Sequence, residues 1–77
     1  MASAHLRFYA ALRDHFGKRG EARAFECGAT VGDIARGVVP TGLLAGLRFA
    51  VNDRFVDIDH VLVDGDTVDL LPPFGGG

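Results

Sequence analysis

Hydrophobic and polar positions along the chain follow patterns that predict one main helix. The helix starts after Thr30, which can cap it together with Asp33 three residues later, and it ends before Pro40. Its apolar residues recur at the spacing of one helical face: Val31, Ile34, Ala35, Val38 and Val39. This segment is therefore expected to bury one stripe against a sheet.

The other apolar segments are short, and their composition favours strands. The predicted strands are residues 6–10, 22–26, 47–51, 54–57 and 67–71. Between them we expect one or two helical turns over 11–16, stopped by Gly17, a loop or short helical turn over 41–46, and a two-residue turn at Asn52-Asp53. The order predicts an α+β fold, a four- to five-stranded mixed sheet with one main helix on one face. The expected core is Phe8, Val31, Ile34, Val38, Phe49, Val51, Val68 and Leu70.

Alternation within the predicted strands assigns residues to the sheet face that the helix leaves open. Arg7, Asp57 and Asp69 should point to solvent, so Tyr9, Phe55 and Leu71 should share their face. Scattered surface hydrophobes are normal. Three large ones on one face are better explained as a docking patch, and Arg13 could add a polar contact at its rim.

Length and composition limit the protein to one small domain. Seventy-seven residues leave no room for a cofactor domain beside a substrate domain. The longest apolar run, 42–47, is too short to span a membrane, and the start of the chain lacks the pattern of a signal peptide. We therefore expect a cytoplasmic protein without membrane contact, in which the single Cys27 is a buried or half-buried structural residue.

Charge is distributed unevenly along the chain. Residues 1–48 carry seven Lys/Arg and four Asp/Glu, a balance of +3, whereas residues 49–77 carry one Arg and six Asp, a balance of −5. The acidic part suits a basic protein partner and should repel nucleic acid. Cysteine, histidine and carboxylate spacings match no metal site, and no residue set fits a catalytic triad.

The C-terminal residues carry the strongest functional signal. Gly75-Gly76-Gly77 follow the stiff pair Pro72-Pro73 and Phe74. Glycine has no Cβ, so such a tail can enter a narrow channel and present the carboxylate of Gly77 for acyl chemistry. An ionised carboxylate must first be activated. Since the chain has no phosphate-binding loop, another enzyme would have to use ATP for this step and no cofactor should be bound here.

These residues resemble a known family. Asn52 after Val51, the Asp64-Gly65-Asp66 turn and the ending 70–77 look like the ubiquitin-like sulfur carriers, closest to the small subunit of molybdopterin synthase. The opening segment 7–13 fits the same pattern. The resemblance implies a β-grasp domain over residues 1–71 and an extended tail over 72–77. The bulky Phe74 and the glycine at position 75 depart from the family pattern.

The resemblance also implies the chemistry and the partners. An E1-like enzyme would adenylate Gly77, and a sulfur donor protein would convert it to a thiocarboxylate. In molybdenum cofactor biosynthesis the sulfur would then pass to a precursor, cyclic pyranopterin monophosphate, held by the large synthase subunit. Gly75, Gly76, Pro72, Pro73 and Phe74 would give access to that carboxylate, and the chain would have no catalysis of its own. Three alternatives stay open: a carrier for thiamine, cysteine or a secondary metabolite, a ubiquitin-like modifier, and an interaction domain with an inert tail.

Overall fold

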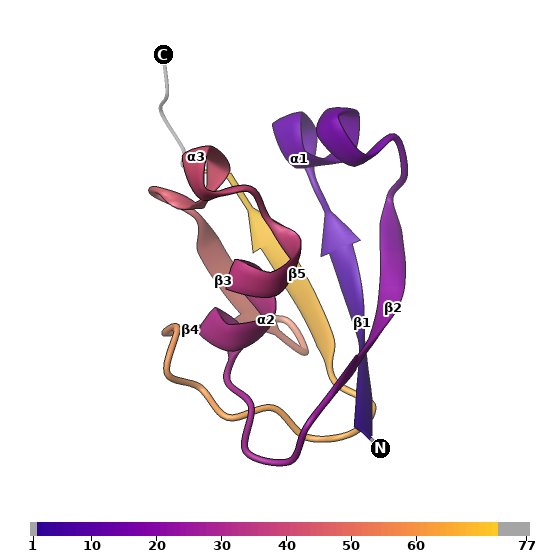
Figure 1. The fold of residues 1–77 in the computed structure, drawn as a ribbon, viewed down its shortest axis with the longest axis vertical. Coiled ribbons are helices and arrows are strands. Elements are labelled where there is room, and N and C mark those ends of the chain that lie inside the picture. Colours follow the sequence, from indigo (N-terminus) through magenta and orange to yellow (C-terminus); the bar gives the residue numbers. More distant parts are fainter. Residues whose placement is uncertain (1, 73–77) are drawn as a thin grey trace.

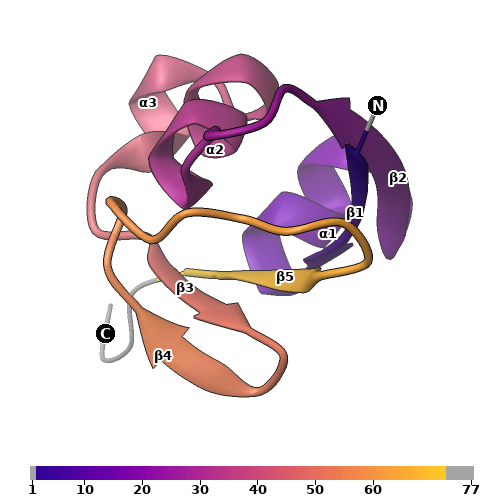
Figure 2. The same cartoon turned by 90° about the horizontal axis from the view of Figure 1, so that it is seen from below.

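A computed structural model describes residues 2–72, which form a five-stranded mixed sheet with three helices (Figure 1). In chain order the elements are β1 (Ala2–Phe8), α1 (Ala10–Phe16), β2 (Gly20–Phe25), α2 (Val31–Val38), α3 (Thr41–Leu44), β3 (Arg48–Val51), β4 (Arg54–Val56) and β5 (Thr67–Leu71). The strand order is β2-β1-β5-β3-β4, and α2 lies against one face (Figure 2). The predicted α+β class and helix-on-sheet arrangement are confirmed.

The last strand, β5, lies in the middle of the sheet. It pairs in parallel with β1 and antiparallel with β3, so both of its edges are hydrogen-bonded. Its inward side chains, Val68 and Leu70, are fully enclosed. The strand that leads into the C-terminal tail is therefore the one that the fold holds most firmly.

The core lies between this sheet and the helices. Seven of the eight predicted core residues are buried; the prediction for Val38 is wrong, because it is only half-buried near the end of α2. Six further apolar residues are buried that belong neither to the predicted core nor to the predicted helix stripe: Ala4, Leu6, Leu12, Phe25, Ala50 and Leu62. Short helix α1 contributes Leu12 and stacks Phe16 on Phe8 with ring centroids 4.4 Å apart.

Helix α2 begins as the sequence predicts. The Thr30 hydroxyl accepts a hydrogen bond from the Asp33 amide, and the Asp33 carboxylate accepts one from the Thr30 amide. These bonds, with Arg36 beside it, lower the pKa of Asp33 below its usual value. The helix stops at Val38, two residues before Pro40.

Several strand boundaries differ from the prediction for local reasons. β1 ends at Phe8 rather than at Ala10, because Tyr9 is the N-cap of α1 and Ala10 has a left-handed φ of 50°. β4 ends at Val56, before Asp57. The Asn52-Asp53 turn is confirmed: both residues have positive φ, 51° and 71°, as a tight hairpin of this hand requires.

Gly20 offers a test of how closely β1 and β2 pair. A Cβ at this position would lie 2.4 Å from the Leu6 carbonyl oxygen, a backbone atom that cannot rotate away. We expect Gly20→Ala to lower the free energy of unfolding by about 1–3 kcal/mol, as overpacking does. Gly37→Ala is the matched control, because nothing lies within 4 Å of its Cβ and alanine favours the helix. Equal thermal midpoints for the two variants would contradict so close an approach of β1 and β2.

Candidate functional site

The site predicted from the sequence starts where β5 ends. Leu71 is the last residue of β5 and pairs with Arg48 of β3, and Pro72 follows it half-buried. The other tail residues named above lie outside the described residues, and their roles stay predictions: Pro73, Phe74, Gly75, Gly76 and Gly77. The described structure therefore fixes the point from which the tail leaves the sheet.

A hydrogen-bonded clamp fixes the other end of β5. The buried carboxylate of Asp66 accepts hydrogen bonds from the Asn52 side-chain amide and from the Val63 backbone amide, both at 2.9 Å. The Asn52 side-chain oxygen accepts from the Thr67 amide at 3.0 Å, and the Asn52 amide donates to the Thr67 carbonyl at 2.9 Å. The clamp joins the β3–β4 turn to the first residue of β5 and so sets the register of that strand.

The open face of the sheet is crossed by one row of side chains. Strand register places Arg7 beside Asp69, Asp69 beside Ala50, and Ala50 beside Phe55. The Arg7 guanidinium donates two hydrogen bonds to Asp69, one of them at 2.8 Å, and approaches Asp53 at 3.5 Å. The hydrogen bond with Asp69, followed by its charge, raises the pKa of Arg7 above its usual value. Because Arg7 covers it, Asp69 is buried on a face where the sequence suggested a solvent-exposed residue.

Phe55 is the most exposed large hydrophobic side chain that the structure describes, at 68 %. The guanidinium of Arg48 lies 5.7 Å from the centre of its ring, within the range of a cation–π contact. Phe55 thus presents an apolar surface beside a positive charge, and β3 lies between its strand and β5, which leads into the tail. Its predicted exposure on the open face is confirmed.

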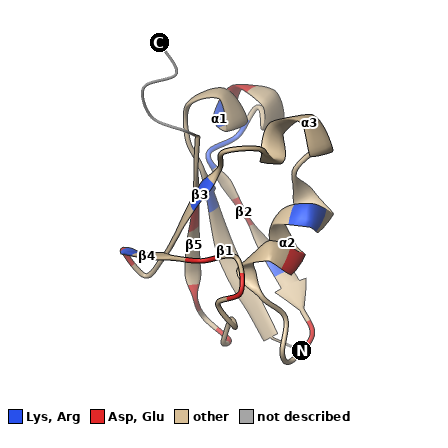
Figure 3. Ribbon diagram, turned by 90° about the vertical axis from the view of Figure 1, so that its left-hand side faces the viewer, with Lys and Arg blue, Asp and Glu red and all other residues tan. Residues whose placement is uncertain are grey.

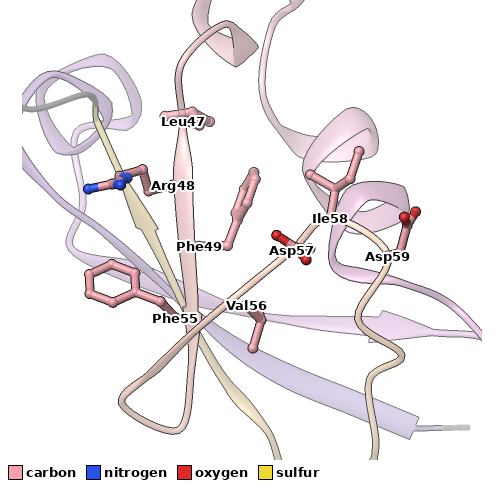
Figure 4. Close-up of a pocket in the computed structure, with 8 residues that line it drawn as sticks. All are labelled: Leu47, Arg48, Phe49, Phe55, Val56, Asp57, Ile58 and Asp59. Carbon is pink, nitrogen blue, oxygen red and sulfur yellow. The ribbon is translucent and has the colours of Figure 1, made fainter.

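A pocket of about 560 Å³ opens at this edge of the sheet (Figure 4). It forms because β4 stops after Val56, so the chain turns away and leaves the start of β3 uncovered. Figure 4 shows Arg48 and Phe55 on one side of the two strands and Phe49 and Ile58 on the other. No sequence pattern predicted this pocket, since it depends on where β4 leaves the sheet.

The remaining predicted docking residues are placed differently from Phe55. Tyr9 is not in a strand, so the alternation argument does not apply to it, and it is half-buried. Leu71 is also half-buried, although it lies beside Arg48 on the open face. Arg13 is exposed on α1. The prediction that Tyr9 and Leu71 are exposed is wrong, while a docking role for all four residues stays a prediction.

Two further features concern chemistry outside the tail. Cys27 is exposed in the turn between β2 and α2, where the Ala29 amide donates to the Glu26 carbonyl, so the expectation of a buried thiol is wrong. Within residues 2–72, no group of three or more His, Cys, Asp or Glu side chains is placed to hold a metal ion. No helix in the same range is long and apolar enough to cross a membrane.

The sheet order, the helix against one face and the central last strand together define a ubiquitin-like β-grasp fold. The model of the ThiS family matches residues 6–77, and the chain belongs to this family. No protein of curated function matches the chain.

Solved structures confirm the fold. A putative molybdopterin converting factor, subunit 1, from Pyrococcus furiosus is 27 % identical, with a TM-score of 0.80 over 95 % of this chain and 99 % of that one. A complex of subunits 1 and 2 of the molybdopterin-converting factor from Helicobacter pylori gives 25 % identity, a TM-score of 0.67, and coverage of 97 % and 99 %. SAMP1 from Haloferax volcanii gives 21 % identity, a TM-score of 0.85, and coverage of 99 % and 100 %.

Proposed function

We propose that this protein carries sulfur on Gly77 as the small subunit of a molybdopterin synthase. The observation that supports this most is how the fold holds the strand that leads into the tail. A central strand, clamped at its start by Asn52 and Asp66, ends at Leu71 beside an open face that presents Phe55 and Arg48. This geometry suits a domain that binds a partner protein through its open sheet face while its C-terminal tail enters the active site of that partner.

The proposed chemistry takes place at one carboxylate. An E1-like enzyme joins the Gly77 carboxylate to AMP and releases pyrophosphate from ATP. The outer sulfur of a persulfide on a donor protein then attacks the acyl carbon and displaces AMP, which gives an acyl disulfide between Gly77 and the donor cysteine. A second thiol, of the donor or of the activating enzyme, then attacks the donor cysteine's sulfur, so that the donor leaves in a protein disulfide and the thiocarboxylate of Gly77 remains. The thiocarboxylate sulfur next attacks a carbon of the acceptor and displaces an oxygen leaving group, which forms a thioester. Water then hydrolyses this thioester, so that the Gly77 carboxylate is restored and the sulfur stays on the acceptor as a thiol. The chain supplies the acyl group and the docking face, and the partner enzymes supply the catalytic groups.

The molybdopterin pathway is the one that the comparisons and the tail favour. The Pyrococcus relative is named as subunit 1 of a molybdopterin converting factor, and the Helicobacter structure contains subunits 1 and 2 of such a factor. The Pro72-Pro73 stem is also more typical of this branch than of the thiamine branch. We therefore propose a large synthase subunit as the acceptor, in the cytoplasm.

A reconstitution tests the pathway. The thiocarboxylated protein is mixed either with a large molybdopterin synthase subunit and cyclic pyranopterin monophosphate, or with a thiazole synthase and its substrates. We expect dithiolene product only in the first mixture. Product only in the second mixture would assign the carrier to thiamine synthesis, and the molybdopterin proposal would be wrong.

A protein modifier is the second candidate, because a terminal diglycine also suits isopeptide formation with lysine side chains. An immunoblot of cells that express the tagged protein separates the two functions. Conjugates of higher mass that disappear when Gly77 is deleted would support the modifier, whereas a carrier remains at the mass of the free protein.

Phe55 allows docking to be tested apart from folding. Since its side chain is largely exposed, we expect Phe55→Asp to change the free energy of unfolding by no more than about 0.5 kcal/mol. The same change should weaken binding to the large subunit at least about tenfold, because a charge would be desolvated in an apolar contact. A melt and a titration of the same sample measure both effects. Unchanged binding by a folded variant would remove Phe55 from the docking surface.

A further inference from the structure

A second exposed apolar surface lies on the chain that connects β4 to β5. Four large hydrophobic side chains are at least half exposed in the described structure, and all of them fall within residues 55–63: Phe55 68 %, Ile58 50 %, Val61 54 % and Val63 63 %. Phe55 belongs to the open face. The other three lie on the connection between β4 and β5, residues 57–66, which we call the acidic connection. The proposed function leaves these three side chains unexplained.

The backbone of the acidic connection is held in place by helix α2 and the turn before it. The Gly32 amide donates to the Ile58 carbonyl, the Val31 amide to the His60 carbonyl, and the Leu62 amide to the Ala29 carbonyl, each at 2.9 Å. The first two bonds also satisfy amides at the start of α2 that have no partner within the helix. A Cβ on Gly32 would lie 3.1 Å from the Ile58 carbonyl oxygen, so the approach is close. The exposed side chains therefore stand on a preorganised backbone.

Val61 offers hydrogen-bonding groups as well as an apolar side chain. It forms an isolated antiparallel bridge with Thr30. The two hydrogen bonds of that bridge are made by the residues on either side of Thr30 and Val61, namely the two bonds given above to His60 and from Leu62. In such a pair the amide and carbonyl of the bridged residue point away from its partner. Within residues 2–72 those groups of Val61 have no hydrogen-bond partner. An added strand could therefore pair with Val61 on its free side.

The charges carried by the acidic connection itself have one sign, and the Arg36 guanidinium, which lies near Ile58, is paired with Asp33. The acidic connection contains four Asp and no Lys or Arg, and acidic positions mark its course in Figure 3. Asp66 is used in the clamp and Asp64 accepts a bond from the Ser3 amide. Asp57 and Asp59 are exposed, and neither makes an ion pair in the part of the chain that the structure describes. A partner with Lys or Arg beside its apolar side chains would complement this surface.

The acidic connection runs from one end of the sheet to the other. Val56, just before it, is level with Phe49 and Leu70 in the strand register, whereas its last residues lead into the start of β5 (Figure 1). Val61 and Val63 belong to the later half of the connection. The start of β5 is separated from its end at Leu71 by five strand residues, roughly 17 Å.

We propose that the acidic connection is a second docking surface, which takes an extended basic segment of a protein partner as an added strand beside Val61. Ile58, Val61 and Val63 contact the apolar side chains of that segment, and Asp57 and Asp59 face its Lys or Arg residues. Through this surface the carrier would stay attached to that partner.

The test is a titration of the ¹⁵N-labelled protein, followed by NMR, with two synthetic peptides. One alternates valine and lysine, and the other alternates valine and glutamate. We expect the lysine peptide to shift the amide signals of Val61 and its neighbours saturably, with weaker binding at high salt. The glutamate peptide should cause no such shifts. Equal shifts with both peptides, or none with the lysine peptide, would overturn the proposal.

Variants locate the contact. Ile58→Ser combined with Val63→Ser should weaken binding of the lysine peptide at least tenfold, while the matched control Phe55→Ser leaves it within twofold. If the double variant does not fold, the single variant Val63→Thr, whose side chain keeps the branched shape of valine, is tested in its place. A larger effect of Phe55→Ser would place the peptide on the open face and refute the proposal. Shifts at Val61 that depend on protein concentration without peptide would also refute it, because they would show that a second copy of the chain occupies the surface.

Discussion

A protein that lacks Gly77 will fold normally and will not be activated. The buried core lies within residues 2–72, so the thermal midpoint should stay unchanged when the last residue is removed. Activation should fall at least about a hundredfold, because misplacing a reacting group by even 1 Å can cost that much and here the reacting carboxylate moves by a whole residue. The measurement is pyrophosphate release by the activating enzyme at saturating ATP.

A C-terminal extension provides the stricter form of this test. Two alanines added after Gly77 leave every residue of the protein in place and convert the carboxylate to an amide. The matched control carries the same two alanines before Met1. We expect activation of the control alone. Full activation of the extended protein, with the extension shown to be intact afterwards, is incompatible with a reactive Gly77 carboxylate.

Loss of the Asp66 carboxylate will destabilise the domain more than any other change in the turn that contains it. Asp66→Ala leaves the Asn52 side chain and the Val63 amide without their acceptor. Bonds to a charged acceptor contribute about 1.5–3 kcal/mol each, so we expect the free energy of unfolding to fall by about 3 kcal/mol. Asp66→Asn keeps one acceptor oxygen and should give a smaller loss. Chemical denaturation of the variants measures both.

The same turn supplies the control. Asp64 is exposed and accepts one bond, from the Ser3 amide, so Asp64→Ala should change the free energy of unfolding by less than about 1 kcal/mol. Equal losses for Asp64→Ala and Asp66→Ala would show that the clamp does not hold β5. The Asp66 variant should also be a poorer substrate for the activating enzyme at temperatures where it is folded, because the register of the tail-bearing strand is less firmly set.

Local signals in the sequence were sufficient for the elements that they control directly. The Thr30–Asp33 capping box and the Asn52-Asp53 turn both predict what the structure shows. Each depends on side chains within a few residues of one another, so neighbouring sequence is enough to define it. The resemblance to sulfur carriers followed from such segments and is confirmed by the family match.

Features that depend on contacts between residues far apart in the chain could not be predicted from the sequence. Tyr9 was assigned to a strand because an aromatic residue after Phe8 favours one, but the chain turns into α1 at that point. Asp69 looked exposed because its partner Arg7 is 62 residues away. The motif residues Asn52 and Asp66 were noticed as part of a family pattern, yet their structural role emerges only when β5 is placed beside β3.

The central claim is that Gly77 becomes a thiocarboxylate, and intact-mass spectrometry of the protein purified from its native cells tests it most directly. Replacing one oxygen by sulfur adds a defined mass, and a thioacid-selective reagent must locate that gain at Gly77, since oxidation of Met1 or Cys27 adds a similar mass. We predict a labelled fraction that disappears when Gly77 is deleted. A native protein whose Gly77 is always an ordinary carboxylate, in cells that are making molybdenum cofactor, would contradict the account.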